Sequence, residues 1–466
     1  MKVSRCLDRL CRLPARRLGR TAIAWRCGAI LLATGTMSAF GAETASLDVS
    51  VSAQSVESGL AGSMSGLEAS SRKRDPNKLG LPEMLTIVRA THPAVTSRQA
   101  DVDAAESSLL GAKLRFLPAP SFDRTDLSGQ SASTVRLEQP LWTGGRLMAG
   151  LDGADAKAKI SSASLSEIQL NLSLRTVTHY QSFVALTGRL GVVNDGLRRL
   201  TELRQMIENR SVAGTSAVQD VDLAHSRIAQ MQSDRAAIFA SRQSVLAQLS
   251  QLLGRRVSES DIDPTPAPLP SMDLASVESR ALQTSPTVLK SRLNIDSASA
   301  DEKYAKSAFW PTLSFRAEYQ DGQYAGSLQP GSRWYMVVNY VPGAGFSSIA
   351  DVAAAKARIR VAESDLETTG RDVMDKIQTE MDDYESARVR LPDLMRATQL
   401  SIGQIESSKR LFVLGRRSWL DLLNSVRELV VVHQQEVEAR ALLMGSYYRL
   451  GLLAGDLYPS ESTARE

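Results

Sequence analysis

The residues that most often carry protein chemistry are sparse and scattered in this chain. Four histidines, His92, His179, His225 and His433, lie far apart, and none has a second histidine or a carboxylate at metal-ligand spacing. His225 and His433 fall on or near helical seams, which favours packed or pore-lining roles over metal binding. There is no Gly-rich phosphate loop ending in Lys-Ser/Thr and no nucleophile elbow. The sequence therefore predicts no catalytic residue, no metal site and no cofactor.

Two aspartates and one arginine are placed more regularly, and their chemistry is electrostatic. Asp220 follows Gly214 by six residues, Asp421 follows Gly415 by six residues, and Arg417 precedes Asp421 by four. Acids in such positions can simply stabilise the N-terminus of the next helix through its dipole. Because the same acid recurs at the same offset, with an arginine beside the second copy, a shared electrostatic function is favoured.

The first 41 residues predict a secretory signal peptide. Eight basic residues and one acid precede an apolar run, Cys27–Phe40, that ends in small residues. The alternative is a membrane anchor, but the run is shorter than the roughly 20 apolar residues that a spanning helix needs. Residues 1–41 contribute +7 to the net charge of +4, which leaves the mature part near −3, so no nucleic-acid partner is expected. All three cysteines lie in this segment, at Cys6, Cys11 and Cys27.

The remaining chain repeats one plan twice. After a segment of no assigned structure (42–79), residues 80–260 form a first repeat and residues 274–457 a second, joined by a Pro-rich linker (261–273) and followed by a tail (458–466). The match is carried by residues spaced 201 apart: Gly214 with Gly415, Asp220 with Asp421, and Gly254 with Gly455. The sequence therefore predicts two structurally equivalent halves.

Each half predicts the same series of elements. An opening helix (81–116, 274–309) ends before a proline, and two short alternating stretches then form a β-hairpin, with Gly129 and Gly322 marking the turns. A long helix of 68 residues follows (146–213, 347–414), which spans roughly 100 Å at about 1.5 Å per residue. A glycine turn and a shorter antiparallel helix complete the half. A bend is expected at Gly191 in the first half and at Pro392 in the second.

The strands predict one apolar and one polar face. In Leu313–Tyr319 the apolar residues take odd positions and the polar residues even positions, as in a half-exposed strand. Aromatic residues crowd around the second hairpin, which suggests ordinary strand packing or, with the export signal, a girdle at a membrane interface. These residues are Trp310, Phe315, Tyr319, Trp334 and Tyr340, together with Phe309, Tyr324 and Tyr335.

Four strands and two long helical hairpins cannot complete a self-sufficient fold. A sheet in lipid cannot keep open edges, and closed membrane barrels begin at about eight strands. Oligomerisation resolves this, and the periodicity leaves open whether two or three chains take part.

The signal, the doubled plan and the paired turns resemble the TolC family of outer-membrane channels over about residues 80–457. The resemblance implies a mainly α fold with a small β part, and a homotrimer that closes a 12-stranded barrel on an α-helical periplasmic tunnel. It also implies localisation in the outer membrane of a Gram-negative bacterium, contact with outer-membrane lipid, and no enzymatic activity.

The resemblance further implies a gate at the two glycine turns, Gly214 and Gly415. Asp220 and Arg417 match the residues that link the closed tip within or between protomers, and Asp421 matches an acidic ring that favours cations. Three positions depart from the family pattern: Phe412 stands in place of tyrosine, Asn424 in place of a second acid, and Gln219 in place of threonine. We therefore expect one carboxylate ring and fewer polar links.

Three functions are compatible with the sequence. The first is the exit duct for a protein substrate in type I secretion, including a large adhesin, with a periplasmic adaptor and an inner-membrane ABC transporter. The second is the outer channel of a drug or small-molecule efflux pump driven by protons. A lipid-anchored cysteine is common in efflux relatives, and its absence favours the first. The third, a purely structural periplasmic coiled coil, does not explain the amphipathic hairpins.

Overall fold

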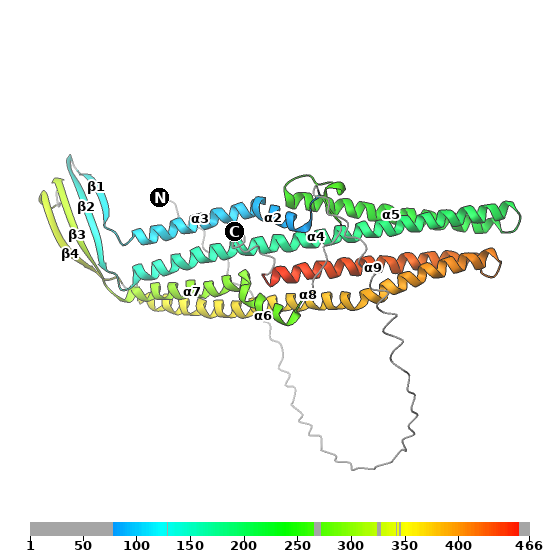
Figure 1. Cartoon of the computed structure of the whole chain (residues 1–466). Helices are drawn as coiled ribbons and strands as arrows, with labels where there is room; N and C mark the ends of the chain where they lie inside the picture. Colours follow the sequence, from blue (N-terminus) through cyan, green and yellow to red (C-terminus); the bar gives the residue numbers. More distant parts are fainter. Residues whose placement is uncertain are drawn as a thin grey trace, which may run out of the picture. The chain divides into compact units, whose positions relative to one another are not determined.

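The computed structural model describes residues 78–127, 129–264, 272–323, 328–341, 343 and 346–455. The predicted signal peptide, nearly all of segment 42–79, residues 265–271 of the linker and the tail lie outside the described residues. The described part is mostly helical, with one antiparallel sheet (Figure 1).

Both repeats form the same sequence of elements. The first contains α2 (Leu81–Thr91), α3 (Pro93–Leu114), β1 (Ala119–Leu127), β2 (Gln130–Trp142), α4 (Arg146–Val212) and α5 (Val218–Leu253). The second contains α6 (Leu274–Thr284), α7 (Pro286–Lys306), β3 (Thr312–Gly322), β4 (Gly331–Asn339), α8 (Ser348–Val413) and α9 (Trp419–Leu453). Short 3₁₀ turns at Glu259–Asp261 and Ser307–Phe309 complete the described elements. The long helices have 67 and 66 residues, close to the predicted 68.

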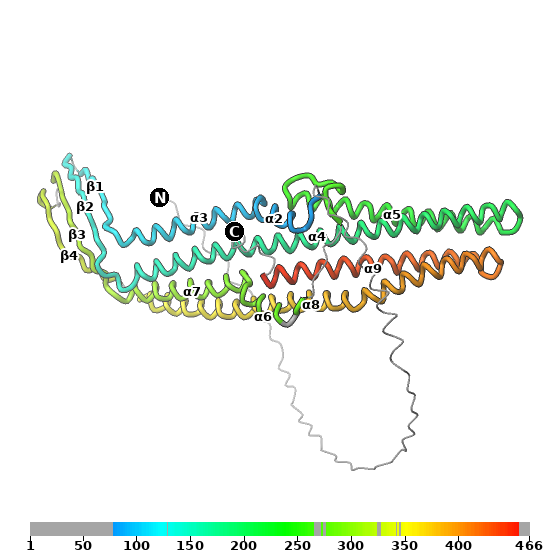
Figure 2. Tube along the Cα trace, in the orientation of Figure 1, coloured from blue at the N-terminus to red at the C-terminus, as the bar shows by residue number. Residues whose placement is uncertain are grey.

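The two repeats interleave rather than forming separate bodies. Next to the sheet, the helices lie side by side in the order α3, α4, α7, α8 (Figure 1). Toward the opposite end the order is α5, α4, α9, α8, and the α4–α5 and α8–α9 turns lie together at that end (Figure 2). Since α4 and α9 are inner helices, the layer has two free edges, one at α3 and α5 and the other at α8.

The opening helices differ from the prediction. Each is split in two, at His92 and at Ser285, because the next residue is a proline that occupies the first position of the following helix. The residue before the proline becomes the N-cap: His92 Nδ1 accepts a hydrogen bond from the Ala94 N–H at 3.1 Å. The predicted single helices 81–116 and 274–309 were therefore wrong at these positions.

The four strands form one sheet in the order β1-β2-β3-β4. The β1–β2 turn contains Gly129, as predicted, with φ +82°. Gly322 instead ends β3, and β4 begins at Gly331. The pairing of β2 with β3, for example Val135 with Tyr319, joins the two repeats across almost the whole sheet.

The apolar residues that recur at alternating spacings of three and four along α4 predict a helical seam, and this seam is buried. Phe183, Val193 and Leu200 on α4 are at most 3% exposed, and Leu186, Leu190 and Leu197 pack against the same core clusters. The core near the turns combines residues of α4, α5, α8 and α9. Both long helices continue through Gly191 and Pro392 without a break. The sequence period therefore identified the face that holds the two helical hairpins together.

Gly196 allows the close approach of α4 to α9. A Cβ atom at this position would lie 2.7 Å from Val430 Cγ2 and 2.8 Å from Met231 Sδ. We expect Gly196→Ala to destabilise the protein, because overpacking costs about 1–3 kcal/mol and outweighs the helix-propensity gain of about 1 kcal/mol.

Gly191→Ala is the matched control, because no atom lies within 4 Å of its Cβ position on the same helix. Urea unfolding in detergent should give a lower midpoint for Gly196→Ala and an equal or higher midpoint for Gly191→Ala. Equal midpoints for Gly196→Ala and the parent would show that α4 and α9 have room to adjust.

Among the described residues, no helix has the length and apolar character required to cross a membrane.

Candidate functional site: a two-faced sheet and a pair of tip turns

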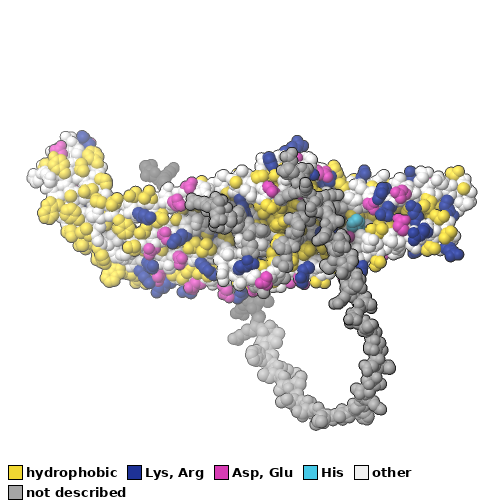
Figure 3. Space-filling view, in the orientation of Figure 1, with side chains coloured by type: hydrophobic (Ala, Val, Ile, Leu, Met, Phe, Trp, Pro, Cys, Tyr) yellow, Lys and Arg dark blue, Asp and Glu magenta, His cyan; other side chains and the backbone are white. Residues whose placement is uncertain are grey.

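One face of the sheet is apolar and exposed. The register places Phe122, Val135 and Tyr319 in one row across β1, β2 and β3. Leu137 on β2 and Trp334 on β4 lie in a second row on the same face. These side chains are between 45% and 78% exposed, although exposing aromatic and aliphatic groups to water is unfavourable. Hydrophobic side chains gather over the sheet in the space-filling view (Figure 3). The face therefore has the character of a surface that contacts lipid.

The aromatic residues singled out in the sequence lie on or beside this face. Phe315, Tyr319 and Trp334 are exposed on the strands, and Trp310 and Tyr340 are exposed at the strand ends. Trp310 makes an edge-to-face contact with Trp142, with ring centroids 6.0 Å apart. Their membrane-girdle function stays a prediction. Tyr324 lies outside the described residues. Tyr335 points to the opposite face.

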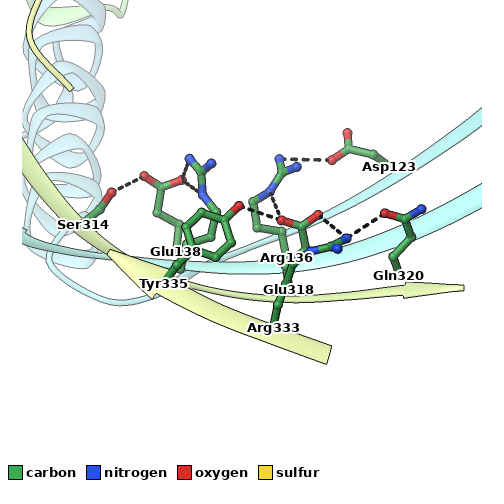
Figure 4. Close-up of polar contacts among 9 residues, drawn as sticks. Asp123, Arg136, Glu138, Ser314, Glu318, Gln320, Arg333 and Tyr335 are labelled. Atoms are coloured by element: carbon green, nitrogen blue, oxygen red, sulfur yellow. Dashed lines mark hydrogen bonds and ion pairs between the residues drawn. The ribbon is translucent and has the colours of Figure 1, made fainter. Parts of the chain in front are cut away.

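The opposite face carries charged groups in contact with one another (Figure 4). Glu318 on β3 is only 9% exposed and lies between two guanidinium groups, with Arg333 Nη2 at 3.4 Å and Arg136 Nε at 3.8 Å. The Tyr335 hydroxyl donates to Glu318 Oε2 at 2.9 Å. Arg333 also donates to the Gln320 side chain at 2.7 Å. This cluster connects β2, β3 and β4.

A second cluster joins the two repeats on the same face. Arg316 on β3 donates to Glu138 Oε2 on β2 at 2.7 and 3.2 Å, and the Ser314 hydroxyl donates to Glu138 Oε1 at 2.8 Å. Charge-assisted pairs of this kind are stronger than neutral hydrogen bonds. Acids and arginines alternate here, so the polar face carries charge of both signs.

We expect Glu318→Gln to weaken the folded protein. Loss of the Glu318 carboxylate leaves Arg136 and Arg333 side by side without their shared partner. We expect the free energy of unfolding to fall by about 1–3 kcal/mol, after allowing for the partial exposure of both arginines. The measurement is the temperature at which the folded species is lost on semi-native gels. Asp126→Asn is the control, because its ion pair with Arg124 is more than half exposed and contributes little. Equal shifts for both variants would contradict the account.

The predicted tip turns share one backbone geometry. Gly214 and Gly415 have φ of +70° and +71°, a region that glycine adopts without strain. Thr215 N–H donates to Arg210 O at 2.9 Å, and Arg416 N–H donates to Leu411 O at 2.9 Å. Together with bonds from the glycine N–H groups, these form a Schellman motif at the end of each long helix. The repeat seen in the sequence therefore extends to the hydrogen bonds of the turns.

The predicted gate residues surround these turns. Asp421 and Gln219 are exposed, Asp220, Arg417 and Asn424 are half-buried, and Phe412 is 7% exposed within the core. The Asp421 N–H donates to Ser418 Oγ, the N-cap of α9, at 3.1 Å. Within the described part of one protomer, neither the Asp220 carboxylate nor Arg417 forms an ion pair. The Asp220–Arg417 link therefore stays a prediction for contacts between protomers.

Sequence reasoning missed two features. The acid–arginine clusters on the sheet were not singled out, although Arg136 with Glu138 and Arg316 with Glu318 repeat a charged i, i+2 pair on one strand face. Trp419 was not singled out either, and its side chain is only 5% exposed at the tip.

The described residues contain no group of histidine, cysteine, aspartate or glutamate side chains arranged to hold a metal ion. His92 caps a helix, and His225 Nε2 lies 3.5 Å from Glu208 Oε1.

The fold and part of the sequence match known proteins. The family model for outer membrane efflux proteins matches residues 85–255. The chain is 22% identical over 392 residues to the pyoverdine export outer membrane protein OpmQ of Pseudomonas putida, with 81% of each chain covered.

Solved structures agree on the fold. The outer membrane protein VceC of Vibrio cholerae has a TM-score of 0.70 and 16% identity, over 80% of this chain and 96% of that chain. The Campylobacter jejuni CmeC outer membrane channel has a TM-score of 0.70 and 14% identity, over 82% and 88%. Residues 85–255 thus match the outer membrane efflux protein family, and the described residues share the fold of the solved outer-membrane channels.

Proposed function

We propose that three copies of the chain close into a ring. Among the described residues the sheet ends in two edge strands, β1 and β4, each paired on one side only, and the helical layer ends in two free edges on the same sides. A sheet in lipid must satisfy its edge N–H and C=O groups, so β4 of one copy pairs with β1 of the next. Three copies supply twelve strands, as the resemblance to the TolC family implies.

The two faces of the sheet then have separate environments. The apolar face with Phe122, Val135 and Trp334 contacts lipid, and the face with Glu318 and Arg136 lines an aqueous lumen. This alternation is the pattern of membrane barrels with a polar interior. The observation that carries the proposal is the separation, from Val135 to Glu138 and their partner rows, of exposed apolar residues on one face from paired charged residues on the other. Among the described residues, only toward the β1–β2 turn does the apolar face carry an ion pair, Arg124 with Asp126.

The ring serves as the exit duct of a tripartite export system, docked to a periplasmic adaptor and an inner-membrane transporter. A small molecule is the first candidate cargo, because the relative matched over 81% of both chains is named for the export of pyoverdine. A protein substrate of type I secretion is the second candidate. It is favoured by the absence of cysteine after position 27, because a lipid-anchored cysteine is common in efflux relatives.

Deletion of the gene tests the proposal and separates the cargoes. We expect raised susceptibility to small toxic compounds, or reduced export of a small secreted metabolite, with unchanged surface adhesin. Loss of adhesin with unchanged small-molecule tolerance would instead establish the type I assignment. If neither property changes, although the protein is present in the outer membrane of the parent strain, the export function is contradicted.

A further inference from the structure

Trp419 is buried where its neighbours in the sequence are exposed. It is the first residue of α9 and is 5% exposed, whereas Leu420 is 49% exposed and Leu414 on the preceding turn is 68% exposed. A large side chain at the tip of a helical hairpin gains most by packing against the neighbouring hairpin. The burial of Trp419 therefore points to a contact between the two turns.

The contacts of Trp419 and of its partner Phe412 together involve all four helices at the tip. Its ring lies 5.4 Å from that of Phe412 on α8, and the Arg210 guanidinium of α4 lies 4.9 Å from the Phe412 ring centroid. The indole Nε1–H donates to the main-chain oxygen of Asp220 on α5 at 2.9 Å. An aromatic pair, a cation–π contact and a partly buried hydrogen bond thus connect one turn to the other.

These contacts lie at the position where the resemblance implied a link between Asp220 and Arg417. Asp220 takes part through its backbone carbonyl, and Arg417 forms no ion pair within the described part of the protomer. Phe412 has no hydroxyl group, so it joins the tip through its ring alone. The tip of one protomer is therefore held by ring packing, a cation–π contact and a neutral hydrogen bond rather than by an ion pair.

We propose that Trp419 is a positioning residue of the gate, which locks the α8–α9 turn to the α4–α5 turn inside each protomer. The inference rests on the proposed function in that the locked turns are the narrow end of an export duct. Because an indole–carbonyl bond is neutral, this lock is insensitive to ionic strength, whereas exposed ion pairs between protomers weaken with salt.

The test measures the separation of the two turns directly. The cysteines of the chain lie only at positions 6, 11 and 27, so spin labels at V212C and V413C, both exposed tip residues, report the distance between turns. Labelled chains are assembled with an excess of unlabelled chains. We expect a longer and broader distance distribution for Trp419→Phe, which keeps a ring but loses the N–H donor, and a larger change for Trp419→Ala.

Leu420→Ala is the matched control, and its distribution should equal that of the parent. A parental distribution for both Trp419 variants would overturn the proposal. Planar-bilayer conductance is the second readout: Trp419→Phe should raise the resting conductance at both low and high salt. Altered turn spacing in a protein that forms no channel would contradict the proposed function while leaving the lock established.

Discussion

Val135→Arg should abolish the folded, membrane-inserted protein. Val135 is 50% exposed at the middle of β2, in a row with Phe122 and Tyr319 on the apolar face. An arginine on the lipid face near the middle of the bilayer costs about 2–4 kcal/mol, and the cost recurs in each of the three copies of the proposed ring. The expected result is loss of the heat-modifiable species from outer-membrane fractions.

Thr134→Arg is the matched control, one residue away on the opposite face. Thr134 pairs with Asp123 and Gln320, so the arginine enters a row that already contains an acid. We expect the folded species to persist in this variant. Equal loss in both variants, or survival of both, would contradict the assignment of one face to lipid and the other to the lumen.

Neutralising the tip acid has the second largest expected effect. In the proposed ring, three exposed Asp421 side chains meet at the narrow end, where carboxylates favour cations. Asp421→Asn should raise the conductance severalfold and reduce the preference for cations. Arg417→Glu should also raise the conductance, because it replaces an attractive link with a repulsive one. Both are measured in planar bilayers.

Asp222→Asn is the control for these variants, because Asp222 is an exposed acid near the other tip turn. Its conductance should equal that of the parent. If Asp421→Asn and Arg417→Glu also conduct like the parent, neither residue belongs to the gate. Since Asn424 replaces the second acid of the family pattern, no other carboxylate one helical turn from Asp421 compensates for its loss.

Most of the fold could be predicted because it is encoded locally and twice. Period-2 and near-3.5 patterns give the hairpins and the long helices, and glycines at a constant shift give the turns. The errors also have local causes. Pro93 and Pro286 begin new helices, and Gly322 is the last residue of a strand rather than part of a turn.

The contacts that define the site were less accessible from the sequence. Arg136 and Glu318 are 182 residues apart, and Trp419 and Asp220 are 199 apart, so no periodicity relates them. Their proximity depends on the pairing of β2 with β3 and of α4 with α9, which joins the two repeats. The charged alternation within each strand was the available signal for the first pair. No comparable signal existed for the indole of Trp419.

In the proposed ring, the open edges of one sheet are joined by copies of the same chain. The most direct test places one cysteine on β1, at Ser121, and scans a second along β4, from Ser332 to Val338, in a chain whose own cysteines lie only at positions 6, 11 and 27. After oxidation in outer membranes, denaturing gels should show covalent species of two and three chains and no larger species. Bridges within single chains only, or a ladder that ends at two or continues past three, would contradict the closed ring of three.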